Sequence, residues 1–136
     1  MPIEGLDHIN IVTPRLETTR AFLVEILGLR EGGRPHFEAT GYWLYAGDRP
    51  LIHIQEARIP VGSSHVCALN HVAFRVTDFD ELVARLRARE VPVDVRTVPG
   101  TTVRQAFFDD PNGVRLEIGE TPEAGPPRPV NNDWTG

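Results

Sequence analysis

Several features that would point to particular classes of protein are scarce in this sequence. It contains a single cysteine, Cys67, so no internal disulfide can form, which fits a reducing cytoplasm. No apolar run approaches the roughly 20 residues that a membrane-spanning helix needs, and the N-terminus lacks a basic-then-apolar signal segment. We therefore expect a cytoplasmic protein with no membrane partner. Cys67 is expected to be a small buried side chain, because nothing places a base beside it as a nucleophile would require.

Positive charge is scarce as well. The formal net charge is −5 at pH 7, and the 14 basic residues are scattered along the chain. No basic stripe could neutralise the phosphates of a nucleic acid, and no basic amphipathic helix could lie on a membrane. The 136 residues, of which 40% are hydrophobic and 24% charged, are enough for one globular domain with a sizeable core.

What the sequence does contain is an internal repeat. A Leu-Asp-His-Ile segment around His8 recurs as Leu-Asn-His-Val around His71, and Pro-Leu-Ile-His-Ile around His53 recurs as Val-Arg-Leu-Glu-Ile around Glu117. His71 follows His8 by 63 positions, and Glu117 follows His53 by 64. One nearly constant period indicates that a single supersecondary unit occurs twice.

The first copy predicts a strand, a helix and three further strands. Apolar and polar residues alternate over residues 6–12, which is typical of a strand with one apolar face. Thr13 and Pro14 suit the N-cap and first position of a helix, and Gly28 suits its left-handed C-cap. Further strands are predicted near residues 29–34, 41–46 and 51–55.

The second copy predicts the same order of elements. Alternation over residues 71–76 predicts a strand, and Thr77 suits the cap of a helix that ends before Pro92. An Asp-Pro-Asn-Gly segment at residues 110–113 predicts a tight turn between two strands. The last three strands are predicted near residues 93–98, 103–108 and 114–118.

Each copy is therefore predicted to be a βαβββ module in an α+β fold. We place the modules at residues 5–57 and 68–120 of a single domain that spans residues 1–120. The proline-rich tail, residues 121–136, offers little to bury and is expected to be loosely ordered.

Alternation also predicts which side chains share a face. The helices should cover the apolar face, formed by Ile9, Ile11, Val72, Phe74, Leu116 and Ile118. The opposite faces should form a polar cup lined by His8, Asn10, His53, Gln55, His71, Arg75, Arg115 and Glu117.

Three imidazoles and one carboxylate in this cup suit a divalent cation such as Zn²⁺, Ni²⁺, Co²⁺, Fe²⁺ or Mn²⁺. Any one of these histidines alone would more simply be a hydrogen-bonded strand residue. Their coincidence at matching positions of a repeat favours a metal site made by His8, His53, His71 and Glu117. Asn10, Gln55, Arg75 and Arg115 share the predicted cup and are candidate substrate-binding residues. The two arginines could clamp a substrate carboxylate or phosphate, or pair with Glu117 or the rim instead.

These motifs, over about residues 5–120, resemble the vicinal oxygen chelate superfamily (glyoxalase/bleomycin resistance protein/extradiol dioxygenase). The most specific of them is the Asp-Pro-Asn-Gly turn followed by a strand that carries Glu117. The resemblance implies two βαβββ modules paired into a cupped, incomplete mixed β-barrel, and a homodimer. It also implies metal ligands on the first and fourth strands of each module, which map onto His8, His53, His71 and Glu117. His53 departs from the Glu or Gln that glyoxalase-type members often carry there.

The resemblance further implies a metal-dependent lyase or isomerase of glyoxalase type. Its substrate would be a small oxygenated molecule that chelates the metal, with Glu117 as the catalytic proton shuttle. A second reading is an Fe²⁺-dependent extradiol dioxygenase that uses His8, His71 and Glu117. Thiol transfer or antibiotic modification is a third, and a metal-free drug-sequestering protein, as in bleomycin resistance, is a fourth. The sequence leaves open whether the modules pair within one chain or between chains.

Overall fold

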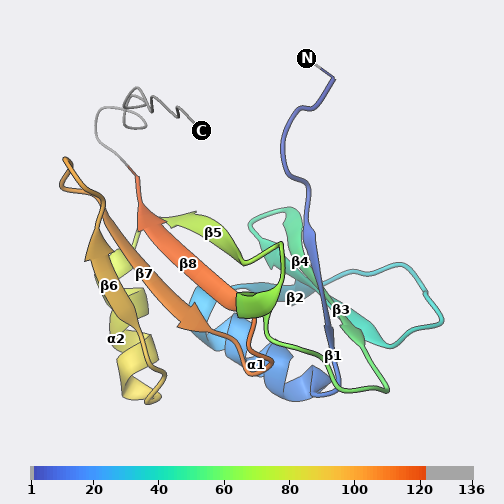
Figure 1. Ribbon diagram of the computed structural model, residues 1–136. Coiled ribbons are helices and arrows are strands. Elements are labelled where there is room, and N and C mark those ends of the chain that lie inside the picture. Colours follow the sequence, from blue (N-terminus) through green and yellow to red (C-terminus); the bar gives the residue numbers. More distant parts are fainter. Residues whose placement is uncertain (1, 122–136) are drawn as a thin grey trace, which may run out of the picture.

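The computed structural model describes residues 2–121 of the chain (Figure 1). The prediction for the tail therefore lies outside the described residues, except for Thr121. The first module consists of β1 (Ile9–Thr13), α1 (Leu16–Leu27), β2 (Arg30–Gly32), β3 (Gly41–Ala46) and β4 (Arg49–Glu56). A short 3₁₀ turn, η1 (Ser64–Val66), lies in the linker. The second module consists of β5 (His71–Val76), α2 (Phe79–Ala88), β6 (Asp94–Thr97), β7 (Arg104–Asp109) and β8 (Arg115–Glu120).

The two modules form two mixed four-stranded sheets of the same topology. The strand orders are β1-β4-β3-β2 and β5-β8-β7-β6. In each sheet the first strand of the module runs parallel to the fourth, and the other pairs are antiparallel. The predicted α+β fold of two βαβββ modules is confirmed. Within residues 2–121 no strand of one sheet pairs with a strand of the other, so the two sheets are not closed into a barrel.

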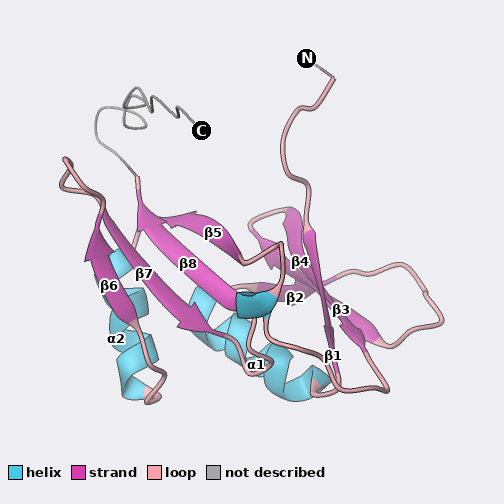
Figure 2. Cartoon of the chain, viewed as in Figure 1, coloured by secondary structure: helices cyan, strands magenta, loops and turns pink. Residues whose placement is uncertain are grey.

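A single hydrophobic core joins the modules. Helix α1 contacts β3 and β4, α2 contacts β8, and the helices contact each other. Figure 2 shows both helices on one side of the β5–β8 sheet. Of the residues predicted to face the helices, Ile11, Leu116 and Ile118 are buried, and Ile9 and Phe74 are partly buried against the core.

Neither helix starts with the cap that the sequence predicts. The residue before α1 is Arg15 and the residue before α2 is Asp78, and neither side chain caps its helix. The Thr13 hydroxyl instead accepts a hydrogen bond from the Arg15 backbone N–H at 2.9 Å and contacts the second module. The predicted C-cap is confirmed, since Gly28 adopts the left-handed conformation with φ 68°.

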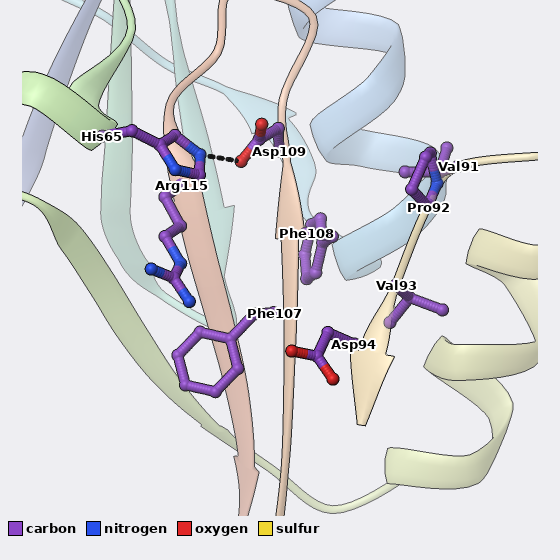
Figure 3. Close-up of a pocket in the computed structure, with 9 residues that line it drawn as sticks. All are labelled: His65, Val91, Pro92, Val93, Asp94, Phe107, Phe108, Asp109 and Arg115. Carbon is purple, nitrogen blue, oxygen red and sulfur yellow. Dashed lines mark hydrogen bonds and ion pairs between the residues drawn. The ribbon is translucent and has the colours of Figure 1, made fainter. Parts of the chain in front are cut away.

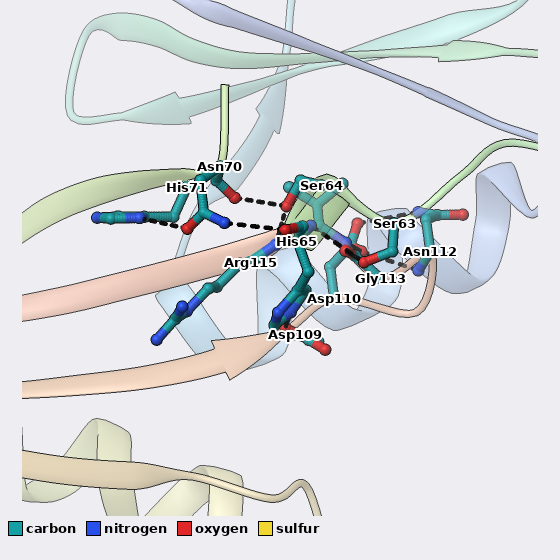
Figure 4. A network of polar contacts seen from close by, with 11 residues as sticks. Ser63, Ser64, His65, Asn70, His71, Asp109, Asp110, Asn112, Gly113 and Arg115 are labelled. Atoms are coloured by element: carbon teal, nitrogen blue, oxygen red, sulfur yellow. Dashed lines mark hydrogen bonds and ion pairs between the residues drawn. The ribbon is translucent and has the colours of Figure 1, made fainter. Parts of the chain in front are cut away.

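The Asp-Pro-Asn-Gly turn joins β7 to β8, and Figure 4 shows it beside Ser63 and Ser64 of the linker. The turn also links the two modules. Asp110 is buried, and its carboxylate accepts hydrogen bonds from the backbone N–H groups of Asn112 and Val114, each at 2.8 Å. The Asn112 amide reaches the first module, where it contacts the hydroxyls of Thr13 at 2.6 Å and Thr19 at 2.9 Å. Burial raises the pKa of Asp110, and the hydrogen bonds of Asn112 and Val114 oppose that rise.

Neither helix of the described chain is long and apolar enough to cross a membrane.

Candidate metal and substrate site

The polar face of the first sheet carries a stack of three rings. The His53 imidazole on β4 lies between His8, with ring centroids 3.8 Å apart, and Trp43, with ring centroids 4.1 Å apart. Both ring pairs are nearly parallel, at 14° and 10°. Register explains the second contact, because Trp43 on β3 is the direct cross-strand partner of His53.

The His53 imidazole is sheltered and has a buried nitrogen. Its Nε2 atom has no hydrogen-bond partner among the described residues. Burial, followed by the nearby His8, lowers the pKa of His53 below its usual value of 6.5. His53 is therefore neutral at pH 7, which is the form of imidazole that binds a metal ion.

The residues that precede His8 and His71 each contact the ring of the histidine that follows. Asp7 Oδ2 lies 2.6 Å from His8 Nδ1, and Asn70 Oδ1 lies 2.9 Å from His71 Nδ1. A carboxylate or an amide carbonyl oxygen can only accept, so Nδ1 of each ring carries the proton. For a neutral His8 ring this leaves the Nε2 lone pair available, as in metal sites where a histidine donates its other N–H to a neighbouring group.

The second sheet carries the other predicted pair. His71 Nε2 lies 3.2 Å from Glu117 Oε2, on adjacent strands β5 and β8. Glu117 is only 6% exposed although it is acidic. Donor atoms bound at 2.0–2.2 Å to one ion lie about 3.0–3.5 Å apart, so this pair has a separation suited to shared ligation.

The structure therefore brings the four predicted ligands together as two pairs. His8 stacks on His53, His71 contacts Glu117, and no group of three or more possible ligands forms a metal site anywhere in residues 2–121. His8 and His71 do line a common cavity of about 420 Å³ between β1 and β5. Val72, predicted to lie under the helices, also lines this cavity.

The residues predicted to bind substrate divide between the sheets in the same way. Asn10 and Gln55 line a cavity of about 330 Å³ with His8 and His53. Arg115 lies over the Phe107 ring, with Cζ 4.6 Å from the ring centroid. In the described chain neither Arg115 nor the exposed Arg75 forms an ion pair with Glu117.

The sequence did not identify His65 as part of any site. The linker folds back over the β7–β8 turn, and His65 Nε2 lies 2.7 Å from Asp109 Oδ1 (Figure 3). This contact lies at a cavity of about 370 Å³ that Phe107 and Arg115 also line. His65 has no counterpart in the repeat, so periodicity could not reveal it. The prediction for Cys67 was wrong: the side chain is exposed in the linker, where its thiol donates to the Ser63 carbonyl at 3.4 Å.

Comparison with known proteins agrees with this geometry. Residues 5–118 match the model of the Glyoxalase/Bleomycin resistance protein/Dioxygenase superfamily. The chain belongs to this superfamily. The superfamily includes metal-dependent enzymes.

Several known proteins are similar to this one over most of the chain. The chain is 30% identical over 125 residues to the uncharacterized protein YaeR of Escherichia coli (strain K12), covering 87% of this chain and 97% of YaeR. It is 30% identical over 122 residues to the "Putative ring-cleaving dioxygenase MhqA" of Bacillus subtilis (strain 168), covering 84% of this chain but 39% of MhqA. The crystal structure of a glyoxalase family protein from Enterococcus faecalis superposes with a TM-score of 0.67 at 28% identity, covering 88% of this chain and 100% of that one.

Proposed function

We propose that this protein is a metal-dependent enzyme of glyoxalase-like lyase or isomerase type. Its substrate would be a small oxygenated molecule whose oxygens chelate a divalent transition metal ion held by His8, His53, His71 and Glu117. The observation that carries the proposal is the arrangement of the ligand atoms. Two histidines present Nε2 atoms whose Nδ1 atoms are held by Asp7 or Asn70, and the third has a buried, unpartnered Nε2 within the described chain.

When bound, the cation would act as a Lewis acid that stabilises negative charge on the substrate oxygens. The chain's own groups account for the remaining requirements. Glu117, nearly buried beside His71, would accept and return a proton of the substrate. The side chains of Asn10 and Gln55 would orient polar groups of the substrate, and Trp43 would exclude water from one side of the pocket.

We propose that a second copy of the chain completes the site. The ligand pairs lie on different sheets. His71 is the first residue of β5, His8 immediately precedes β1, and β1 and β5 are end strands of their sheets. The leucines two positions before these histidines are exposed, Leu6 at 67% and Leu69 at 74%. Exposed leucines at matching sheet edges suit a two-fold symmetric interface, since such an interface buries equivalent surfaces. In this homodimer, His8 and His53 of one chain would face His71 and Glu117 of the partner.

The experiment is metal analysis combined with mixing of complementary variants. One chain carries His8→Ala and His53→Ala, and the other carries His71→Ala and Glu117→Gln. Neither variant alone should bind metal. Mixed after unfolding and refolding together, they should regain about one metal ion per heterodimer, because one of its two shared sites is intact.

The wild-type chain serves as the control and should bind about one ion per chain in a dimer. Metal binding by wild type but none by the mixed variants would place each site within one chain. A wild-type protein that takes up no transition metal would refute the enzyme proposal. It would favour the alternative function, a metal-free protein that sequesters a drug.

A dioxygenase is the second candidate, because of the similarity to MhqA. In that case His8, His71 and Glu117 would hold Fe²⁺, with two histidines and one carboxylate leaving positions open for substrate and O₂. Oxygen consumption on catechols after anaerobic loading with Fe²⁺ would support it. Turnover without oxygen uptake would support the lyase or isomerase.

A further inference from the structure

One cavity of the first module contains two buried nitrogen atoms that lack partners. Arg34 Nε and His53 Nε2 are the only buried side-chain nitrogen or oxygen atoms in residues 2–121 without a hydrogen bond, and both side chains line the same cavity of about 330 Å³. Burying a polar group without a partner costs free energy, more so when the group is charged. His53 Nε2 is the atom assigned to the metal ion under the proposed function, which leaves Arg34 Nε as the buried donor of this cavity that still lacks an acceptor.

Arg34 is held so that most of its donors are unused. The guanidinium Nη2 donates to the Ala39 carbonyl at 2.8 Å, and Cζ lies 4.9 Å from the centroid of the Phe37 ring. A Cβ at position 41 would come within 3.1 Å of Nη2, so Gly41 leaves room for this placement. Arg34 forms no ion pair with any described carboxylate. One of five N–H donors is thus engaged, and the side chain is fixed in place before a ligand arrives.

The rest of the cavity wall suits a negatively charged ligand. None of the nine described residues that line it is acidic. The wall adds an aromatic side, formed by Trp43 and Phe37, and two amides, Asn10 and Gln55. A cavity of this volume accepts a small molecule, and a planar guanidinium binds the two oxygens of a carboxylate or phosphonate through paired hydrogen bonds.

We infer that Arg34 is the anchor for an oxyanion group, a carboxylate or a phosphonate, on a small ligand that lies against Trp43 beside His53. That this ligand is the enzyme's substrate rests on the function proposed above; that the cavity binds anions does not. The arginines of the other sheet are less suited to this role. Arg75 is exposed to solvent, where water competes for its donors, and Arg115 has no buried, unpartnered nitrogen within residues 2–121.

The test uses metal-free protein and two aromatic probes, phenylphosphonate and benzoate, with benzamide as the uncharged control. Calorimetric titration should show binding of at least one of the anions and at least about tenfold weaker binding of benzamide. Arg34→Gln should weaken anion binding by about tenfold or more, whereas Arg34→Lys should retain part of it. The matched control is Arg87→Gln, which removes the same charge from the exposed face of α2 and should bind like wild type.

A second measurement does not depend on any variant folding. In ¹⁵N-labelled wild-type protein, the Arg34 Nε–H resonance should shift on addition of the bound anion, and the Arg87 resonance should not. Equal binding by Arg34→Gln and wild type, equal binding of benzamide and the anions, or an unmoved Arg34 resonance would each overturn the inference. Because the titrations contain no metal, these outcomes are independent of the metal analysis: absence of metal with intact anion binding refutes the enzyme proposal alone.

Discussion

Thr13 Oγ1 lies 2.6 Å from Asn112 Oδ1, although 99 positions separate the two residues in the sequence. Thr13 ends the first strand of one module, and Asn112 lies in the last turn of the other. Both Thr13 and its neighbour Thr19 are fully buried. The contact is therefore a shielded hydrogen bond across the module boundary, where water cannot replace a lost partner.

Replacing Thr13 by Val should destabilise the protein without changing its shape much. Valine has nearly the shape of threonine but leaves the Asn112 side-chain oxygen without its donor and the Arg15 backbone N–H without its acceptor, at a cost of about 1–3 kcal/mol. Urea denaturation should show a lower midpoint at an unchanged slope. The control is Thr77→Val, whose exposed hydroxyl contacts only the adjacent Asp78 and whose loss should change the unfolding free energy by less than about 0.5 kcal/mol. Equal unfolding free energies of the two variants would contradict a stabilising role for the Thr13–Asn112 hydrogen bond.

Acid should destabilise the protein in part through Arg104. Its guanidinium lies 2.8 Å from Asp80 and 2.5 Å from Glu120, and it lowers the pKa of both carboxyls below their usual values of 3.8 and 4.5. Acids with a lowered folded-state pKa stabilise the fold above their unfolded pKa, and that stabilisation is lost as the pH falls through the folded value. Arg104→Gln should therefore flatten the dependence of unfolding free energy on pH below about 4.5.

Denaturation at a series of pH values between 3 and 7 would measure this effect. Arg87→Gln removes the same charge without an ion pair in the described chain and should keep the wild-type slope. A slope unchanged in Arg104→Gln would show that other groups control acid sensitivity.

Asp7 and Asn70 should act through the histidines that follow them. Removing either acceptor, by Asp7→Ala or Asn70→Ala, frees Nδ1 of the next ring and lets the proton exchange between its two nitrogens. Metal affinity should fall by about 10–100-fold, as expected for loss of a partner that orients a ligand. The ¹⁵N shifts of the His8 or His71 ring in metal-free protein should report a mixture of tautomers. Asp48→Ala removes a comparable exposed charge and should change neither the metal affinity nor the ¹⁵N shifts of the histidine rings. Unchanged ring shifts in both variants would exclude this role.

Trp43 should control the protonation of His53. Burial is the main cause of the low pKa of His53, and the Trp43 ring covers one face of the imidazole at 4.1 Å. Trp43→Ala admits water to that face, so the pKa of His53 should rise toward 6.5, whereas Trp43→Phe keeps a stacked ring and should raise it less. NMR titration of the imidazole would measure both. A pKa that fell, or did not move, in Trp43→Ala would mean that Trp43 does not set the burial of His53.

The sequence predicted the fold well because its signals are local and periodic. Alternation at period two located β5 and most of β1, the Asp-Pro-Asn-Gly turn separated β7 from β8, and Gly28 marked the end of α1. Strand ends shifted by a few residues: β1 starts at Ile9 and β2 covers only Arg30–Gly32. The predicted cap of α1 failed because the hydroxyl of Thr13 is used in a tertiary contact that no local pattern reveals. The predicted cap of α2 failed by one residue, because Asp78 precedes the helix and the Thr77 hydroxyl contacts Asp78 instead.

Only those residues of the candidate site that occupy matching positions of the internal repeat could be predicted from the sequence. Periodicity placed His53 and Glu117 on polar strand faces, and the paired groups His8–His53 and His71–Glu117 lie on those faces. Arg34 lies in a loop whose path depends on packing against Phe37 and Gly41, which alternation does not describe. Whether the two ligand pairs meet depends on how sheets associate, and this information is not contained in the pattern of either half.

The shared core has a consequence for how the duplicated halves relate. Leu23 and Ile26 of α1 belong to the same buried cluster as Leu86 of α2, and the Arg85 side chain donates to the Ile26 carbonyl. An excised half would lose the partner helix that shields its apolar stripe from water. Each half therefore depends on the other for its stability, so cleavage of the backbone between the halves should destabilise the protein less than removal of one half.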